Sequence, residues 1–209
     1  MAADAGAGDG SDIDAGLQFG HAPSPLLGQV VFNEVLVDGT TEGDPNGDGD
    51  ADPVEDQFVE IVNAGTAAVA LDGFTLVDRN LAALPRHTFG SFTLAAGKAA
   101  VVFGGGDAPA ATAGATFFAA NAEDQGIPFG LNLVTPASYL LLLDPDQRLV
   151  AAFCYGDALP IAECALTAAA DQSLTRSPDV SGGFVPHTGA TGSGGAAFSV
   201  GTRVDGTWF

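Results

Sequence analysis

Short apolar segments separated by turn residues are the feature that most constrains the fold of this chain. VVFNEVLV (residues 30–37), FVEIVN (58–63) and AAVVF (99–103) are rich in valine, isoleucine and phenylalanine. Runs of about four to eight such residues favour strands, whereas an amphipathic helix needs about ten or more residues at a spacing of three or four. The 29 glycines and 12 prolines supply the turns between these runs. We therefore expect an all-β protein.

Four further segments extend this pattern to a predicted β-sandwich. They are FTLVD (74–78), TFGSFTL (88–94), SYLLLLD (138–144) and RLVAAFCY (148–155). The residues Pro145, Asp146 and Gln147 predict a hairpin between the last two, and AAGK (95–98) predicts a tight turn. The connection over residues 104–132 holds Phe117 and Phe118 and is expected to cross between sheets. After Asp157 the strand pattern fades.

The segment DPNGDGDADPVE, from Asp44 to Glu55, carries the strongest chemical signal. It matches the pattern D-x-[DN]-x-[DN]-G-x5-E of a twelve-residue calcium loop at every defined position. Calcium binds six to eight hard oxygen ligands, which alternate residues of a curled loop can supply. The pattern predicts an EF-hand-like loop between the first two strands, in a setting of strands where helices are usual. The predicted ligands are Asp44, Asn46, Asp48, the carbonyl of Asp50, Asp52 and a bidentate Glu55.

A solvated acidic loop with Asp-Gly turns is the alternative interpretation of the same segment. Eight carboxylates lie between Asp38 and Asp56 with no basic residue among them, so a divalent cation would relieve their repulsion. Calcium fits better than magnesium, which uses fewer protein ligands. Glu34 and Glu60, in the two strands beside the loop, are either supplementary ligands or structural hydrogen-bonding residues, and the structural role is favoured.

The balance of acidic and basic residues limits the kinds of partner that the protein can bind. The chain has 26 acidic and 6 basic residues and a formal net charge of −20, which repels nucleic acid and anionic lipid. Adaptation to high salt would also explain this charge. The sequence contains no run of eighteen apolar residues, so we expect no transmembrane segment.

The two cysteines and the N-terminal region bear on the compartment. Cys154 and Cys164 are either a disulfide, which we favour, or two buried thiols. Residues 1–29 are rich in Ala, Gly and Asp and predict a flexible acidic linker. We expect a secreted or cell-surface protein whose signal sequence or lipid anchor lies outside this chain.

Signatures of an enzyme are missing from the sequence. His21, His87 and His187 lie far apart and form no H-E-x-x-H motif, and G-x-S-x-G is also missing. GGGD (104–107) lacks the lysine of a phosphate-binding loop and is interpreted as a turn at a strand end. We expect no enzymatic activity, no catalytic residues and no organic cofactor.

Taken in order, the strand segments over residues 30–156 resemble a lamin-tail domain of the kind found in bacterial surface and secreted proteins. The resemblance rests on VVFNEVLV, DQFVEIVNAGTAAVALDGFTLVD, RHTFGSFTLAAGKAAVVFGGG and GLNLVTPASYLLLLDPDQRLVAAFCYG. It implies an immunoglobulin-like sandwich of seven to nine strands that builds assemblies or binds partners. Residues 157–209 would then be a C-terminal extension laid over the domain and anchored by aromatic residues.

These inferences predict a calcium-binding structural, adhesion or protein-interaction module. One alternative is recognition of a glycan or another ligand of the cell envelope through Tyr155, Phe184 and Trp208. Another is self-assembly through an exposed sheet edge. The expected partners are calcium and, among macromolecules, other surface proteins, glycans or a second copy of the chain.

Overall fold

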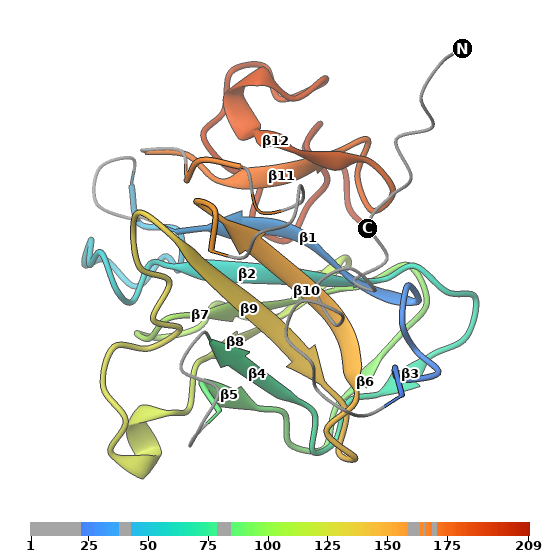
Figure 1. Cartoon of the computed structure of the whole chain (residues 1–209). Helices are drawn as coiled ribbons and strands as arrows, with labels where there is room; N and C mark the ends of the chain where they lie inside the picture. Colours follow the sequence, from blue (N-terminus) through green and yellow to red (C-terminus); the bar gives the residue numbers. More distant parts are fainter. Residues whose placement is uncertain (1–21, 38–42, 79–84, 159–163, 165, 169–170) are drawn as a thin grey trace.

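Twelve strands in three sheets account for nearly all the regular structure of the residues described here. The structure is a computed structural model that describes residues 22–37, 43–78, 85–158, 164, 166–168 and 171–209 (Figure 1). The strands are β1 (Val30–Leu36), β2 (Phe58–Asn63), β3 (Val69–Ala70), β4 (Thr75–Asp78), β5 (His87–Thr88), β6 (Thr93–Leu94), β7 (Ala99–Phe103), β8 (Ala115–Ala119), β9 (Ser138–Leu143), β10 (Leu149–Tyr155), β11 (Leu174–Ser177) and β12 (Gly183–Pro186). The 3-10 helices η1 (Glu123–Gln125) and η3 (His187–Gly189) are single turns, and no helix in these ranges is long and apolar enough to cross a membrane. The all-β prediction is confirmed.

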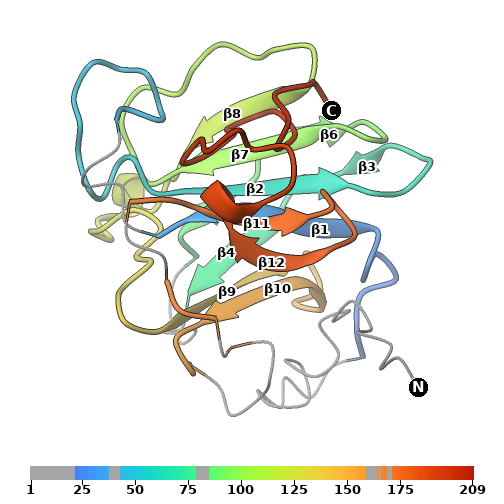
Figure 2. The same ribbon diagram turned by 90° about the horizontal axis from the view of Figure 1, so that it is seen from above.

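Two of the sheets pack face to face. The larger has the strand order β12-β11-β1-β2-β7-β8, and the smaller has the order β10-β9-β4-β5 (Figure 2). All pairs are antiparallel except β7 with β8, which run parallel. The third sheet is the short pair β3 and β6. The predicted hairpin of residues 138–155 is confirmed as the β9–β10 pair.

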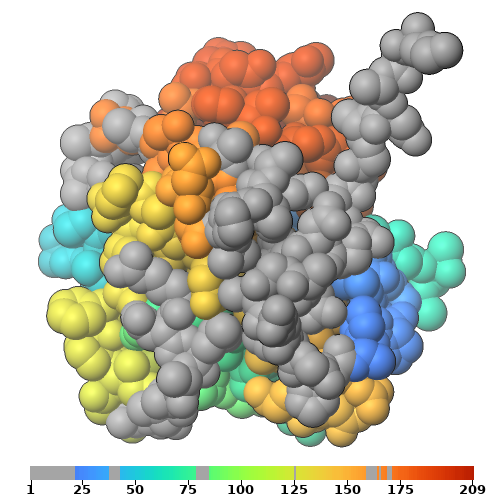
Figure 3. All heavy atoms as spheres, in the orientation of Figure 1, coloured from blue at the N-terminus to red at the C-terminus, as the bar shows by residue number. Residues whose placement is uncertain are grey.

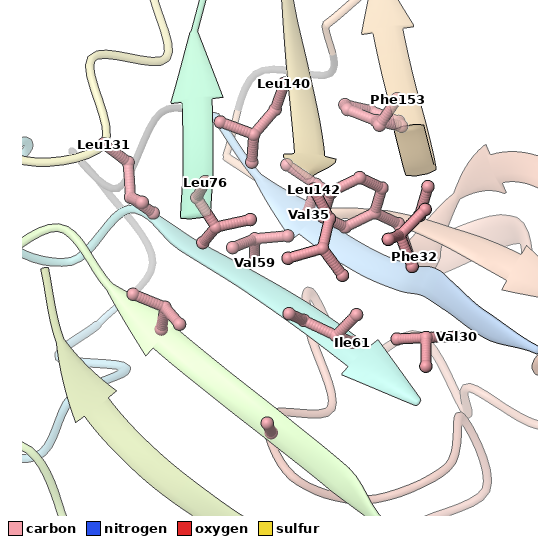
Figure 4. Packing of buried hydrophobic residues seen from close by; sticks show 14 of the residues in the cluster. Val30, Phe32, Val35, Val59, Ile61, Leu76, Leu131, Leu140, Leu142 and Phe153 are labelled. Atoms are coloured by element: carbon pink, nitrogen blue, oxygen red, sulfur yellow. The ribbon is translucent and has the colours of Figure 1, made fainter. Parts of the chain in front are cut away.

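A bulge in β1 allows the hydrophobic core to form between the two sheets. Successive side chains of a strand alternate between faces, so Phe32 and Val35 would point to opposite faces of a regular strand. The register of β1 against β2 shifts between Phe32 and Glu34, which adds the residue needed to bring both side chains inward. There they meet Leu142 and Phe153 of the smaller sheet in one buried cluster (Figure 4).

The outer face of the larger sheet is buried as well. Phe58 and Val62 of β2 lie on this face with Phe209, and Phe198 packs against the same cluster. Consequently all six residues of β2 are buried. The C-terminal region also extends the sheet, because β11 pairs with β1 and β12 pairs with β11. The fading strand pattern after Asp157 did not predict these two strands.

One prediction of strand structure needs correction, and another is incomplete. Residues 88–94 do not form one strand, because residues 89–92 separate β5 in the smaller sheet from β6 in the third. The connection after β7 first adds β8 to the larger sheet, and it crosses to the smaller sheet only afterwards. The side chain of Asn121 marks that crossing, since it accepts a hydrogen bond from Thr88 N and donates one to Thr88 O.

Both ends of β10, an edge strand of the smaller sheet, are bonded to neighbouring segments. Cys154 of β10 forms a disulfide with Cys164, which confirms the favoured state of the two cysteines. At the start of β10, Leu149 O accepts a hydrogen bond from Ser24 N. Residues 1–21 of the predicted linker lie outside the described residues.

Candidate metal-binding loop

The acidic segment Asp44–Glu55 lies between β1 and β2, as the sequence predicts, and curls around the carboxylate of its first residue. Asp44 Oδ1 accepts hydrogen bonds from Gly47 N at 2.6 Å and Asp48 N at 3.1 Å. Asp44 Oδ2 accepts a third from Gly49 N at 2.7 Å. Gly47 and Gly49 both have positive φ, of 74° and 97°, which only glycine adopts without strain. The spaced glycines therefore allow the tight curl.

Asn46 and Asp48 connect the loop to the segment that follows β7. Asn46 is buried, and its amide donates to Asp48 Oδ2 at 3.2 Å. The same oxygen accepts a hydrogen bond from Asp107 N at 3.2 Å, and Asp48 Oδ1 accepts one from Asp50 N at 3.0 Å. The amides of Asp50 and Asp107 lower the pKa of Asp48. Asp48 is thus ionised and fixed in place, although its side chain is open to solvent.

The glycine run 104–106 is the surface on which the loop rests. A Cβ at Gly104 would collide with the carbonyl of Val54, and one at Gly105 would lie 2.9 Å from Glu55 Cγ. A Cβ at Gly106 would collide with Asp48 and Asn46 and would lie 3.3 Å from Glu55 Oε2. The interpretation of GGGD as a strand-end turn is correct in position. Its glycines are also required because the acidic loop, about fifty residues earlier in the chain, packs closely against them.

Like charges crowd the last predicted ligand. The pKa of Glu55 is raised, chiefly by partial burial and then by the carboxylates of Asp52 and Asp48. Asp52 Oδ1 accepts hydrogen bonds from Val54 N at 2.7 Å and Glu55 N at 3.0 Å, so part of its hydrogen-bonding capacity is used within the turn. A cation near Glu55 would reverse this repulsion.

Asp56, directly after the twelve-residue pattern, is a site residue that the sequence analysis did not single out. Its side chain is fully buried. Oδ2 accepts a hydrogen bond from Asp52 N at 2.9 Å, whereas Oδ1 makes no hydrogen bond of normal geometry with the described residues, although the backbone amide of Asn46 also stabilises the carboxylate. Burial raises the pKa of Asp56. A buried oxygen without a partner is costly and is commonly satisfied by an ion or a water molecule.

The structure therefore gathers some predicted ligands but not the complete set. Asn46, Asp48 and Glu55 converge on Gly106, while Asp44 and Asp52 turn towards backbone amides and Asp50 is exposed. As the described side chains are placed, no group of three or more His, Cys, Asp or Glu residues is arranged around a common metal position. Calcium binding would require carboxylates of the loop to turn inward.

Glu34 and Glu60 lie away from this loop in a buried hydrogen-bond network. They are directly opposite each other on β1 and β2, and both are fully buried beneath the C-terminal region. Glu34 accepts hydrogen bonds from the hydroxyl of Ser173 at 2.6 Å and from both N and Oγ of Ser199, at 2.9 and 2.6 Å. Glu60 accepts bonds from Asn33 Nδ2 and Gly201 N, each at 2.9 Å. Their contacts in this structure fit the structural role.

The buried glutamates predict a loss of stability with rising pH. Burial, and then the charge of Glu34, raises the pKa of Glu60 well above its usual value of 4.5. The folded protein therefore keeps a proton that the unfolded chain releases above pH 4.5, so stability falls as pH rises from there to the raised pKa. Urea unfolding at a series of pH values should show a smaller decline for Glu60→Gln than for the wild type. The exposed Glu123→Gln replacement controls for general charge repulsion, and equal declines in Glu60→Gln and the wild type would contradict the prediction.

The histidines and aromatic residues named from the sequence do not form a second site. His87 is buried against Phe89, and burial lowers its pKa to about 4. His187 is also buried, with Nε2 3.9 Å from Glu34 Oε1, and His21 lies outside the described residues. Tyr155 is buried, whereas Trp208 is exposed, so the expected aromatic binding surface of Tyr155, Phe184 and Trp208 is wrong for Tyr155.

Comparison of the sequence with known families identifies the family of this domain. The profile of the Lamin Tail Domain family matches residues 23–157, more than half of the 209-residue chain. The chain belongs to the lamin tail domain family. The matched region of this lamin tail domain runs from before β1 to the end of β10 and includes the acidic loop. Strands β11 and β12 lie beyond the match and complete its larger sheet. A search of curated proteins gave no match.

Proposed function

We propose that this lamin tail domain is a non-enzymatic interaction module that acts outside the cell and is stabilised by calcium bound to the loop Asp44–Glu55. The side chains that would hold the ion are Asp44, Asn46, Asp48, Asp52 and Glu55, with the carbonyl of Asp50 and with Asp56 as an additional ligand. The ion would supply positive charge at a point where carboxylates crowd one another. Its role would be structural, because it would fix the connection between β1 and β2.

The observation that carries this proposal is the carboxylate of Asp56. It is fully buried at the end of the acidic loop and has one oxygen without a hydrogen-bond partner in the described structure. Hard carboxylate and amide oxygens are the donors that calcium prefers, and the loop supplies them at the spacing of a calcium loop. A bound cation would satisfy Asp56 and reduce the repulsion that raises the pKa of Glu55.

The disulfide supports the extracellular part of the proposal. Cys154 and Cys164, ten positions apart in the sequence, form a disulfide, and disulfides persist in oxidising compartments. Family membership supports the absence of enzymatic activity, since lamin tail domains are structural immunoglobulin-like domains. A lamin-like role on nucleic acid is not proposed, because the net charge of −20 opposes binding to phosphates.

Calcium is expected to stabilise the folded protein. At a free concentration one hundred times the dissociation constant, it should raise the free energy of unfolding by about 2.7 kcal/mol. Urea unfolding in calcium and in EDTA measures this gain, and magnesium at the same ionic strength tests selectivity. Glu55→Gln should remove the gain without lowering stability in EDTA, because the replacement also removes a repelled charge.

The exposed replacement Asp124→Asn is the matched control for loss of one charge, and it should keep the full calcium gain. Asp48→Ala should lose the gain, as Glu55→Gln does, although it also removes the contacts to Asp107. Identical unfolding curves for the wild type in calcium and in EDTA would contradict the proposal.

A further inference from the structure

The turn at residues 127–129, Ile-Pro-Phe, presents apolar side chains to solvent next to the acidic loop. Phe129 is 62% exposed and is one of two large hydrophobic side chains that are exposed in the described structure, the other being Trp208. Pro128 is exposed and Ile127 is half-buried. A phenylalanine in this position contributes little hydrophobic stabilisation to the folded state, since most of its surface stays in contact with water.

The backbone at Phe129 adds a second cost. Its φ is +74°, a conformation in which glycine is unstrained and a residue with a large side chain is not. The ring makes no aromatic contact with another described residue that would offset the strain. The domain would thus be more stable with glycine at this position. Costs of this kind are typical of residues that serve recognition.

Hydrogen bonds and close backbone packing hold the turn in one conformation. Arg86 Nη1 donates to Pro128 O at 2.9 Å, and Phe129 O accepts a bond from Asn132 N at 2.7 Å. Arg86 is itself fixed by a buried ion pair with Asp78. A Cβ at Gly130 would collide with the backbone of Gly104, so the turn rests on the same glycine run as the acidic loop. The side chain is therefore presented by a rigid support, which lowers the entropic cost of binding.

The surface around Phe129 is mainly acidic, and the one cation shown to touch the turn, Arg86, is buried and paired with Asp78. In Figure 3 the acidic loop (cyan) and the segment around residue 125 (yellow-green) lie next to each other on one side of the molecule. Residues 43–57 and 104–132 contain no Lys, Arg or His. They contain nine carboxylates, namely Asp44, Asp48, Asp50, Asp52, Glu55, Asp56, Asp107, Glu123 and Asp124. This charge favours a cationic partner and opposes a second copy of the same face, an anionic membrane or nucleic acid.

We propose that residues 127–129 anchor a basic, partly apolar segment of a partner protein, with Phe129 inserting between its apolar side chains and the neighbouring carboxylates contacting its Lys and Arg residues. This inference rests on the proposed role as an interaction module, and it does not require bound calcium. The carboxylates would speed association, and the aromatic anchor would slow dissociation.

The test uses the complete chain and a fluorescein-labelled synthetic peptide that alternates lysine with leucine, with binding followed by anisotropy at low and physiological salt. The wild type should bind this peptide, and Phe129→Gly should weaken binding about tenfold or more. A peptide that alternates lysine with serine should bind more weakly to the wild type and equally to both proteins. Phe129→Gly should unfold at the same or higher urea concentration, so the loss of binding cannot come from unfolding.

Trp208→Ala removes the other exposed aromatic side chain and should bind the lysine-leucine peptide as the wild type does. Equal affinity of Phe129→Gly and the wild type for that peptide would overturn the inference. So would dimerisation of the wild type that Phe129→Gly abolishes, because it would assign the turn to a second copy. Peptide binding without a calcium gain would refute only the calcium proposal, and a calcium gain without peptide binding would refute only this inference.

Discussion

Replacing Glu34 with alanine is expected to lower the free energy of unfolding by about 3–5 kcal/mol, because three buried hydrogen bonds lose their acceptor at a cost of about 1–3 kcal/mol each. Glu34 is fully buried and accepts three hydrogen bonds from Ser173 and Ser199, with His187 3.9 Å away. Its removal would leave those donors without a partner where water does not reach. The loss of stability therefore includes the cost of leaving the donors buried and unpaired, in addition to the hydrogen bonds themselves.

Urea unfolding of Glu34→Ala measures this loss, and the exposed Glu123→Ala is the matched control, which should change stability little. Because Glu34 lies outside the acidic loop, the loss should be the same in calcium and in EDTA. A loss seen only in calcium would make Glu34 a metal ligand, and a loss below about 1 kcal/mol would contradict its role in the network.

Replacing Arg86 with leucine should cost a similar amount, about 3–5 kcal/mol, because it leaves a buried carboxylate without its cation. Arg86 Nε and Nη2 donate to Asp78 Oδ2 at 3.1 and 2.9 Å, and both side chains are buried. Arg86 also holds the turn at Phe129 through Pro128 O, so the variant should bind the lysine-leucine peptide less well even where it remains folded.

The double replacement Asp78→Leu with Arg86→Leu completes a mutant cycle for the ion pair. Removing both charges should cost clearly less than Arg86→Leu alone, because no isolated charge then stays buried. Urea unfolding of the three variants gives the coupling free energy. Additive losses would show that the two side chains act independently and would contradict the ion-pair account.

The strands that the sequence predicts best are those whose side chains carry the core. Residues 58–63 and 99–103 coincide with β2 and β7, because a strand buried on both faces is a short apolar run in the sequence. The strand β11 has the sequence LTRS, and its place is set by hydrogen bonds to β1 and by Arg176, which donates to Phe32 O. Neither interaction produces an apolar pattern by which β11 could be recognised from its own sequence.

For the candidate site, the sequence supplies the loop pattern but not its surroundings. Asp44, Asn46, Asp48 and Glu55 are recognisable by spacing alone. The unpartnered oxygen of Asp56 is a property of burial, and the glycine run at 104–106 reflects a contact between segments far apart in the chain. The strand position of Glu60 is evident from the sequence, but its burial depends on Gly201 and the segment around it.

The placement of β11 beside β1 has a consequence for synthesis of the protein. The hydrogen bond from Arg176 to Phe32 joins residues 144 positions apart, so β1 lacks its second neighbour until the segment around Arg176 has left the ribosome. Contacts between such distant segments form slowly, since the intervening chain must first be ordered. During that interval β1 would be an open sheet edge, with Glu34 and Glu60 lacking the residues that cover them in the folded protein. The nascent chain would complete this sheet, and gain protection against wrong edge pairing, only after β11 has been synthesised.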